Sequence, residues 1–174
     1  MTYTCCDEHF NTEKEFKKHI SSRNWHRLNY ADVIKVKMKN EALYAIIKNP
    51  NLLFGITNLI TPVQDKAILY LPFSKDKTGT VLKRSIVGKL EGPKLEIGGI
   101  KYRFSSSNLI YDFEFHVKRI NEEYSELSVL TSMMVNIGLL GRLLPGEVIK
   151  SLQKMVTPQL IVEKLNKSLA NISI

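Results

Sequence analysis

The sequence of 174 residues predicts an α+β protein, in which a run of antiparallel strands is followed by a long C-terminal helix and preceded by a small separate segment. Three observations lead to this fold class. Strand-like stretches follow one another with short turn signals and no crossover helices, which indicates antiparallel hairpins. The last stretch of the chain has a helical apolar period. Both cysteines and three of the four histidines lie in the first 26 residues, so this segment differs from the rest.

The composition of the chain excludes several classes of protein. The hydrophobic fraction of 44% and the charged fraction of 24% are ordinary for a globular protein, which excludes a disordered or collagen-like chain. No stretch approaches the roughly 18 uncharged apolar residues that a membrane span needs. The polar start of the chain and its two adjacent cysteines predict a reducing, cytoplasmic setting without structural disulfides.

The net charge of +8 raises the question of a polyanionic partner. The lysines are scattered, and no block of five or more basic residues occurs. We therefore expect dispersed solubilising charge and do not expect nucleic-acid binding as the main role. Peripheral contact with an anionic membrane surface stays open.

The first segment has a spacing that points to a metal. His19 lies thirteen positions after Cys6, and His26 lies seven positions after His19. Thr12 and Glu15 form a capping-box pattern, which predicts a helix over Glu13–Ile20 with its histidine on the inner face. A metal bound by thiolates and imidazoles can replace the core that so short a segment cannot build.

Residues 3–26 resemble a C2H2 zinc finger with a long gap between its two histidines. The resemblance implies a ββα module, residues 1–28, and possible zinc ligation by Cys5, Cys6, His19 and His26. The family has a cysteine three residues before Cys6, where this chain has Tyr3; Cys5 is the nearest substitute, and His9 is another possible donor. The alternative is a metal-free module held by Phe10, Phe16 and Trp25. The charged helix start and the single copy argue against base readout and favour a structural or protein-contact role.

The remainder, residues 30–174, predicts one further domain. Alternation at Ile34, Val36 and Met38 predicts a first strand. Asn40 is expected to cap a short helix, Glu41–Lys48, and a second short helix follows at Asn51–Ile56. The predicted strands are then Lys66–Phe73, Thr80–Leu90, Lys94–Ile97, Ile100–Ser105, Leu109–Ile120 and Ser125–Val135, and the last helix runs from Gly146 to about Ala170.

From Ala31 onward the chain resembles the START-like (SRPBCC) helix-grip superfamily, especially its small carbon monoxide dehydrogenase-related and polyketide cyclase-like members. The likeness is carried by the first strand, by the helix that ends in Asn49-Pro50, by the short second helix and by the Gly-rich entry to the last helix. It implies a curved antiparallel sheet around a long C-terminal helix. It also implies an elongated apolar cavity between them that holds lipid-, sterol- or polyketide-like ligands.

The residues expected to line this cavity are apolar or aromatic and lie on the predicted strands and the last helix, although any of them could simply be core: Leu69, Leu71, Tyr102, Phe104, Tyr111, Phe113, Phe115, Met133, Leu152, Met155 and Val156. No catalytic set can be assembled, because the only histidine after the first segment is His116, on the polar face of its strand. Polar residues that could enter the cavity are Tyr70, Arg84 and Arg103.

The sequence therefore predicts a non-catalytic protein that binds or transports a hydrophobic small molecule, lipid- or polyketide-like, with zinc as a possible cofactor of the N-terminal module. One alternative is a cyclase- or hydrolase-type enzyme on the same fold, which needs a buried polar pair in the cavity. Another is an adaptor for nucleic acid or protein assembly that uses the finger and the basic surface. Neither the ligand nor the oligomeric state follows from the sequence.

Overall fold

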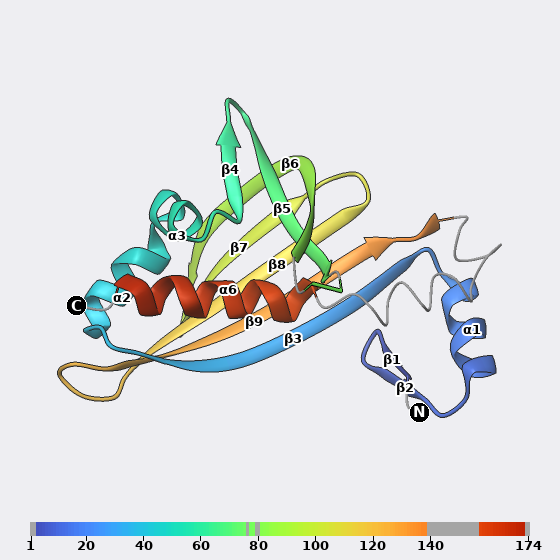
Figure 1. Ribbon diagram of the computed structural model, residues 1–174, viewed down its shortest axis with the longest axis horizontal. Helices are drawn as coiled ribbons and strands as arrows, with labels where there is room; N and C mark the ends of the chain where they lie inside the picture. Colours follow the sequence, from blue (N-terminus) through green and yellow to red (C-terminus); the bar gives the residue numbers. More distant parts are fainter. Residues whose placement is uncertain (1–2, 76, 79–80, 139–156, 173–174) are drawn as a thin grey trace.

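A seven-stranded antiparallel sheet forms most of the computed structural model, which describes residues 3–75, 77–78, 81–138 and 157–172 (Figure 1). The strands lie in the order β3-β9-β8-β7-β6-β5-β4. Their bounds are Trp25–Val36 for β3, Ile60–Val63 for β4, Lys66–Lys75 for β5, Val81–Glu96 for β6, Gly99–Ser105 for β7, Leu109–Arg119 for β8 and Ser125–Asn136 for β9. The predicted α+β class is confirmed.

The sheet curves around one helix. Helix α6, Thr157–Ile172, contacts both β3 and β5 as well as β9 and α3. In a flat sheet, five strand spacings, about 24 Å, would separate β3 from β5, which is twice the width of a helix. The sheet must therefore bend so that strands near its two edges reach the same helix, as Figure 1 shows. Residues 146–156 of the predicted last helix lie outside the described residues.

Two short helices follow β3, as predicted, and they close one end of the sheet (Figure 1). Helix α2 spans Asn40–Lys48 and helix α3 spans Pro50–Thr57. The Asn49 side chain caps α3 by accepting hydrogen bonds from the backbone N–H groups of Asn51 and Leu52. The prediction that Asn40 caps α2 is wrong: Asn40 is the first helical residue, and the capping position is held by Lys39 without a side-chain bond.

A small ββα module lies at the opposite end of the sheet, beside the start of β3 (Figure 1). It consists of β1 (Tyr3–Cys5), β2 (Glu8–Phe10) and α1 (Glu13–Ser22). The Thr12 side chain accepts a 3.2 Å hydrogen bond from the Glu15 N–H, as the capping-box pattern predicts. Buried Cys5, Phe16 and Ile20 form a small hydrophobic cluster separate from that of the sheet.

The sheet corrects two strand predictions and contains one strand that was not predicted. Strand β3 begins at Trp25, nine residues before the predicted Ile34, and pairs with β9 along its whole length, so the boundary expected between the two parts of the chain falls within β3. Lys94–Ile97 is not a separate strand, because β6 continues to Glu96 after a register shift between Glu91 and Lys94. Strand β4 was not expected; it carries Pro62 at the edge of the sheet, where a missing N–H is tolerated.

A glycine on β6 allows a close approach between strands. A Cβ atom on Gly88 would lie 2.3 Å from the Ser105 carbonyl oxygen and 2.6 Å from the ring of Phe104. The Phe104 ring and the Ser105 carbonyl therefore occupy the space that a larger residue at position 88 would need.

Among the described helices, none has the length and apolar character that crossing a bilayer requires.

Candidate functional site

The inner face of the sheet presents a block of aromatic rings. Tyr102 and Phe104 on β7 alternate inward, as do Tyr111, Phe113 and Phe115 on β8, and all five side chains are buried. The register places Tyr102 opposite Phe113 and Phe104 opposite Tyr111, so the rings come from directly paired positions. The centroids of Tyr111 and Phe113 are 4.6 Å apart.

The other predicted lining residues have different outcomes. Leu69 and Met133 are buried in the same cluster as the five aromatic rings. Leu71 lies on β5, but its side chain is not among those that the structure describes, and Leu152, Met155 and Val156 lie outside the described residues. Seven of the eleven predicted residues are therefore brought together around the inner face.

Phe54 was not predicted as a site residue, yet it links the aromatic block to the surface. Its ring lies 5.1 Å from that of Tyr102 and 5.8 Å from that of Phe113. It also lines a pocket of about 570 Å³ between α3, β4, β5 and β6, whose apolar wall includes Ile60 and Ala67. We call this the α3–β5 pocket. The only sequence signal for Phe54 is the apolar composition of the second short helix.

Two tyrosine hydroxyl groups lie inside the apolar core. The Tyr102 hydroxyl donates a 2.7 Å hydrogen bond to the Ile47 carbonyl. The Tyr111 hydroxyl lies near Thr131 but has no hydrogen bond of normal geometry among the described residues. Burial raises the pKa of both phenols well above the usual value, so both are neutral donors at physiological pH.

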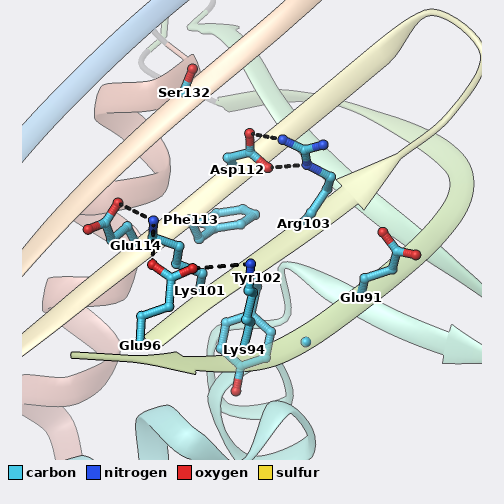
Figure 2. A pocket seen from close by; sticks show the side chains of 11 residues that line it. Glu91, Lys94, Glu96, Lys101, Tyr102, Arg103, Asp112, Phe113, Glu114 and Ser132 are labelled. Atoms are coloured by element: carbon cyan, nitrogen blue, oxygen red, sulfur yellow. Dashed lines mark hydrogen bonds and ion pairs between the residues drawn. The ribbon is translucent and has the colours of Figure 1, made fainter. Parts of the chain in front are cut away.

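The outer face of the sheet carries a second pocket of about 570 Å³ with charged walls (Figure 2). Arg103 forms a bidentate pair with Asp112, and Lys101 lies within ion-pair distance of Glu96 and Glu114. Arg103 is therefore outside the interior, contrary to its place among the candidate cavity residues. His116 also lies on this face, as predicted, and contacts Glu114 and the Gly98 carbonyl.

The N-terminal module brings together the four residues expected to bind metal. One ligand atom from each of Cys5, Cys6, His19 and His26 lies within 4.8 Å of the others. His9, the other donor considered, is exposed and contacts Thr4 instead. Cys5 is the last residue of β1, and Cys6 and Asp7 form the two-residue hairpin turn, with positive φ angles of 57° and 63°. This turn conformation lets the side chains of both adjacent cysteines reach the cluster.

Electrostatics favour uncharged side chains in this cluster. Burial, followed by the adjacent Cys6 thiol, raises the pKa of Cys5 to about 12. Burial also lowers the pKa of His19 and of His26, with a further lowering of the His19 pKa by His26 and Arg23. Neutral imidazoles are the form that binds metal, and a bound cation would displace the thiol protons.

Comparisons with known proteins bear on the fold. No family model and no curated protein matches the sequence. Norcoclaurine synthase from Thalictrum flavum, solved with dopamine and hydroxybenzaldehyde, aligns with a TM-score of 0.54 at 12% identity over 88% of this chain and 90% of that one. The Zhui aromatase/cyclase from a Streptomyces species aligns with a TM-score of 0.52 at 12% identity over 85% and 94%. The chain has the helix-grip fold. At this identity, the helix-grip likeness concerns architecture alone and transfers no residue role.

Proposed function

We propose that the chain binds a hydrophobic small molecule between the inner face of the sheet and α6, without catalysing its conversion. The observation that carries this proposal is the position of Phe54. Its side chain lines the solvent-open α3–β5 pocket and also contacts Tyr102 and Phe113 of the aromatic block. A rotation of the Phe54 ring would therefore open a path from solvent to the apolar interior.

The lining favours a planar, largely apolar ligand. Aromatic side chains stack on conjugated rings with an energy beyond that of area burial, about 0.5–1.5 kcal/mol for each pair. The Tyr111 hydroxyl supplies a neutral donor without a hydrogen bond of normal geometry among the described residues. A carbonyl or hydroxyl oxygen of the ligand could accept its hydrogen bond. A conjugated ring that stacks on the aromatic block is polyketide-like rather than fatty-acid-like.

Thermal denaturation with three probes tests this proposal: hydroxyanthraquinone, palmitate and cholesterol. A ligand at a hundred times its dissociation constant stabilises by about 2.7 kcal/mol. For a chain of this size, that corresponds to a rise in Tm of roughly 5–10 °C. We expect the largest rise with the anthraquinone. Absence of any rise with all three probes would contradict the proposal.

Two tyrosine variants locate the binding. Tyr111→Phe removes the inward hydroxyl, and we expect it to weaken anthraquinone binding by about tenfold, the worth of one hydrogen bond of about 1.4 kcal/mol. Tyr44→Phe is the matched control, because Tyr44 is 40% exposed on α2 and should leave binding unchanged. Equal effects of the two variants would place the ligand elsewhere.

A cyclase- or synthase-type enzyme is the second candidate, and the Tyr111 hydroxyl is the observation that favours it. A neutral buried phenol could donate a hydrogen bond to a reacting carbonyl and stabilise the negative charge that develops on its oxygen. Incubation with dopamine and 4-hydroxybenzaldehyde, chosen after the molecules bound in the norcoclaurine synthase structure, tests this alternative by chromatography of the products. A condensation product that depends on Tyr111 would replace the binding proposal with the enzymatic one.

A further inference from the structure

The distances among Cys5, Cys6 and His26 match those between ligand atoms around one tetrahedral metal ion. The two sulfur atoms are 3.6 Å apart, and His26 Nδ1 lies 3.5 Å from Cys5 Sγ and 3.8 Å from Cys6 Sγ. Zinc bonds of about 2.3 Å to sulfur and about 2.0–2.1 Å to nitrogen, at tetrahedral angles, separate neighbouring ligand atoms by about 3.4–3.8 Å. Cys5, Cys6 and His26 already have this spacing, and the ligand atom of His19 lies within 4.8 Å of theirs.

Each histidine has one nitrogen available for a metal, and its other nitrogen lies beside an oxygen atom. The His26 Nε2–H donates a 3.0 Å hydrogen bond to the Arg23 carbonyl, which leaves Nδ1 facing the two sulfur atoms. His19 is 6% exposed; its Nδ1 lies 3.7 Å from a Glu8 carboxylate oxygen, and its Nε2 is buried without a hydrogen bond among the described residues. Such outer partners are what fix the orientation of metal-binding imidazoles.

Backbone contacts also hold Cys6 in place. The Arg27 N–H points at Cys6 Sγ over 3.4 Å, and the Cys6 N–H donates to the Arg27 carbonyl over 3.1 Å. These contacts attach the β1–β2 turn directly to the start of β3. Two thiolates would neutralise the charge of a divalent ion, so the complete site could be buried without a net charge.

We propose that Cys5 Sγ, Cys6 Sγ, His19 Nε2 and His26 Nδ1 bind one zinc ion in a closed structural site that joins the N-terminal hairpin to the first strand of the sheet. Four protein donors leave no position for a reacting water. Soft thiolates combined with imidazoles in a tetrahedral arrangement favour zinc over magnesium or calcium. His19 Nε2, buried and without a hydrogen-bond partner in the part of the chain that the structure describes, is the observation that a purely hydrophobic module does not explain.

The position of the site gives the ion a second effect. His26 is the second residue of β3, and it pairs with Val135 of β9. One residue beyond the end of the β3–β9 pairing, the Ile137 N–H donates a 2.9 Å hydrogen bond to the Asn24 carbonyl. Zinc at His26 therefore fixes the end of the β3–β9 ladder in addition to the module, and its removal should loosen both.

Metal content and cobalt substitution of the full chain, purified under reducing conditions, test the proposal. We expect one zinc per chain and, after exchange for Co²⁺, the visible bands of a tetrahedral ion with charge-transfer absorbance from two thiolates. Cys5→Ser and Cys6→Ser should each halve this charge-transfer absorbance. His19→Gln should lower zinc affinity by about 100-fold or more, because even loss of an outer partner costs 10- to 100-fold.

His9→Gln is the matched control, since His9 lies in the same module outside the cluster. It should leave metal content and the cobalt spectrum unchanged. The proposal is overturned if the reduced wild-type chain takes up neither ion, if Cys5→Ser retains the full charge-transfer absorbance, or if His9→Gln lowers affinity as much as His19→Gln. The wild-type measurements decide the question even where a variant fails to fold.

Discussion

The Tyr102 hydroxyl on β7 donates a 2.7 Å hydrogen bond to the Ile47 carbonyl near the end of α2. The two residues lie 55 positions apart in the sequence. This bond ties the short helices to the sheet beside Phe54 and so positions the wall of the α3–β5 pocket.

The two interior tyrosines should respond differently to loss of their hydroxyl groups. Tyr102→Phe leaves the buried Ile47 carbonyl unpaired, and we expect a loss of about 1–3 kcal/mol in the free energy of unfolding. Tyr111→Phe removes a hydroxyl without a normal hydrogen bond among the described residues and should cost less than about 0.5 kcal/mol. Urea unfolding measures both. A larger loss for Tyr111→Phe would contradict this assignment.

Alkaline pH should destabilise the chain through the same two residues. Burial raises the pKa of Tyr102 and of Tyr111 in the folded state, so the folded chain holds protons that the unfolded chain releases above pH about 10. Their stabilising contribution is complete below pH 10 and is lost as pH rises toward the folded-state values. The unfolding free energy, followed from pH 8 to 11, should fall less steeply in the double Phe variant. Identical slopes would be the contrary outcome.

Two Gly→Ala variants should change the free energy of unfolding in opposite directions. Gly88→Ala places its Cβ against the Ser105 carbonyl and the Phe104 ring, and we expect a loss of about 1–3 kcal/mol. Gly55 in α3 has no atom within 4 Å of an added Cβ, so Gly55→Ala should stabilise by about 0.4–1 kcal/mol. Thermal unfolding compares them. Tolerance of Gly88→Ala would show that the sheet does not depend on this close approach.

Phe54 should control access to the interior. Phe54→Ala is expected to cost about 3–5 kcal/mol of stability and to speed both association and dissociation of the anthraquinone probe. Leu52→Ala in the same helix is the control, because Leu52 is 46% exposed and should change neither quantity much. Stopped-flow fluorescence gives the rates. Unchanged rates in Phe54→Ala would mean that the probe enters by another route.

The sequence predicted the sheet best where one face is wet and the other buried. Strand β8 alternates Tyr111, Phe113 and Phe115 with charged residues, and the period of two identified its inward face. The first half of β3 continues the alternation at His26, Leu28 and Tyr30, but it was missed because the exposed Asp32 interrupts the pattern before Ile34. Strand β4 was missed because Pro62 predicts a loop unless the strand is known to lie at an edge.

The sequence predicted the residues of the candidate metal cluster less completely. Residue spacing indicated Cys6, His19 and His26 but left the choice between Cys5 and His9 open. That choice depends on the Cys6-Asp7 turn, whose two positive φ angles orient adjacent thiols toward one point. Spacing cannot contain this information, since positive φ is uncommon for residues other than glycine.

Native mass spectrometry of the freshly purified chain, alone and with excess hydroxyanthraquinone, tests the central claim most directly. We expect a complex heavier than the 19.9 kDa chain and its metal by the mass of one small molecule, lost on denaturation and weakened by Tyr111→Phe. A spectrum that contains only the chain and its metal under both conditions would contradict the account.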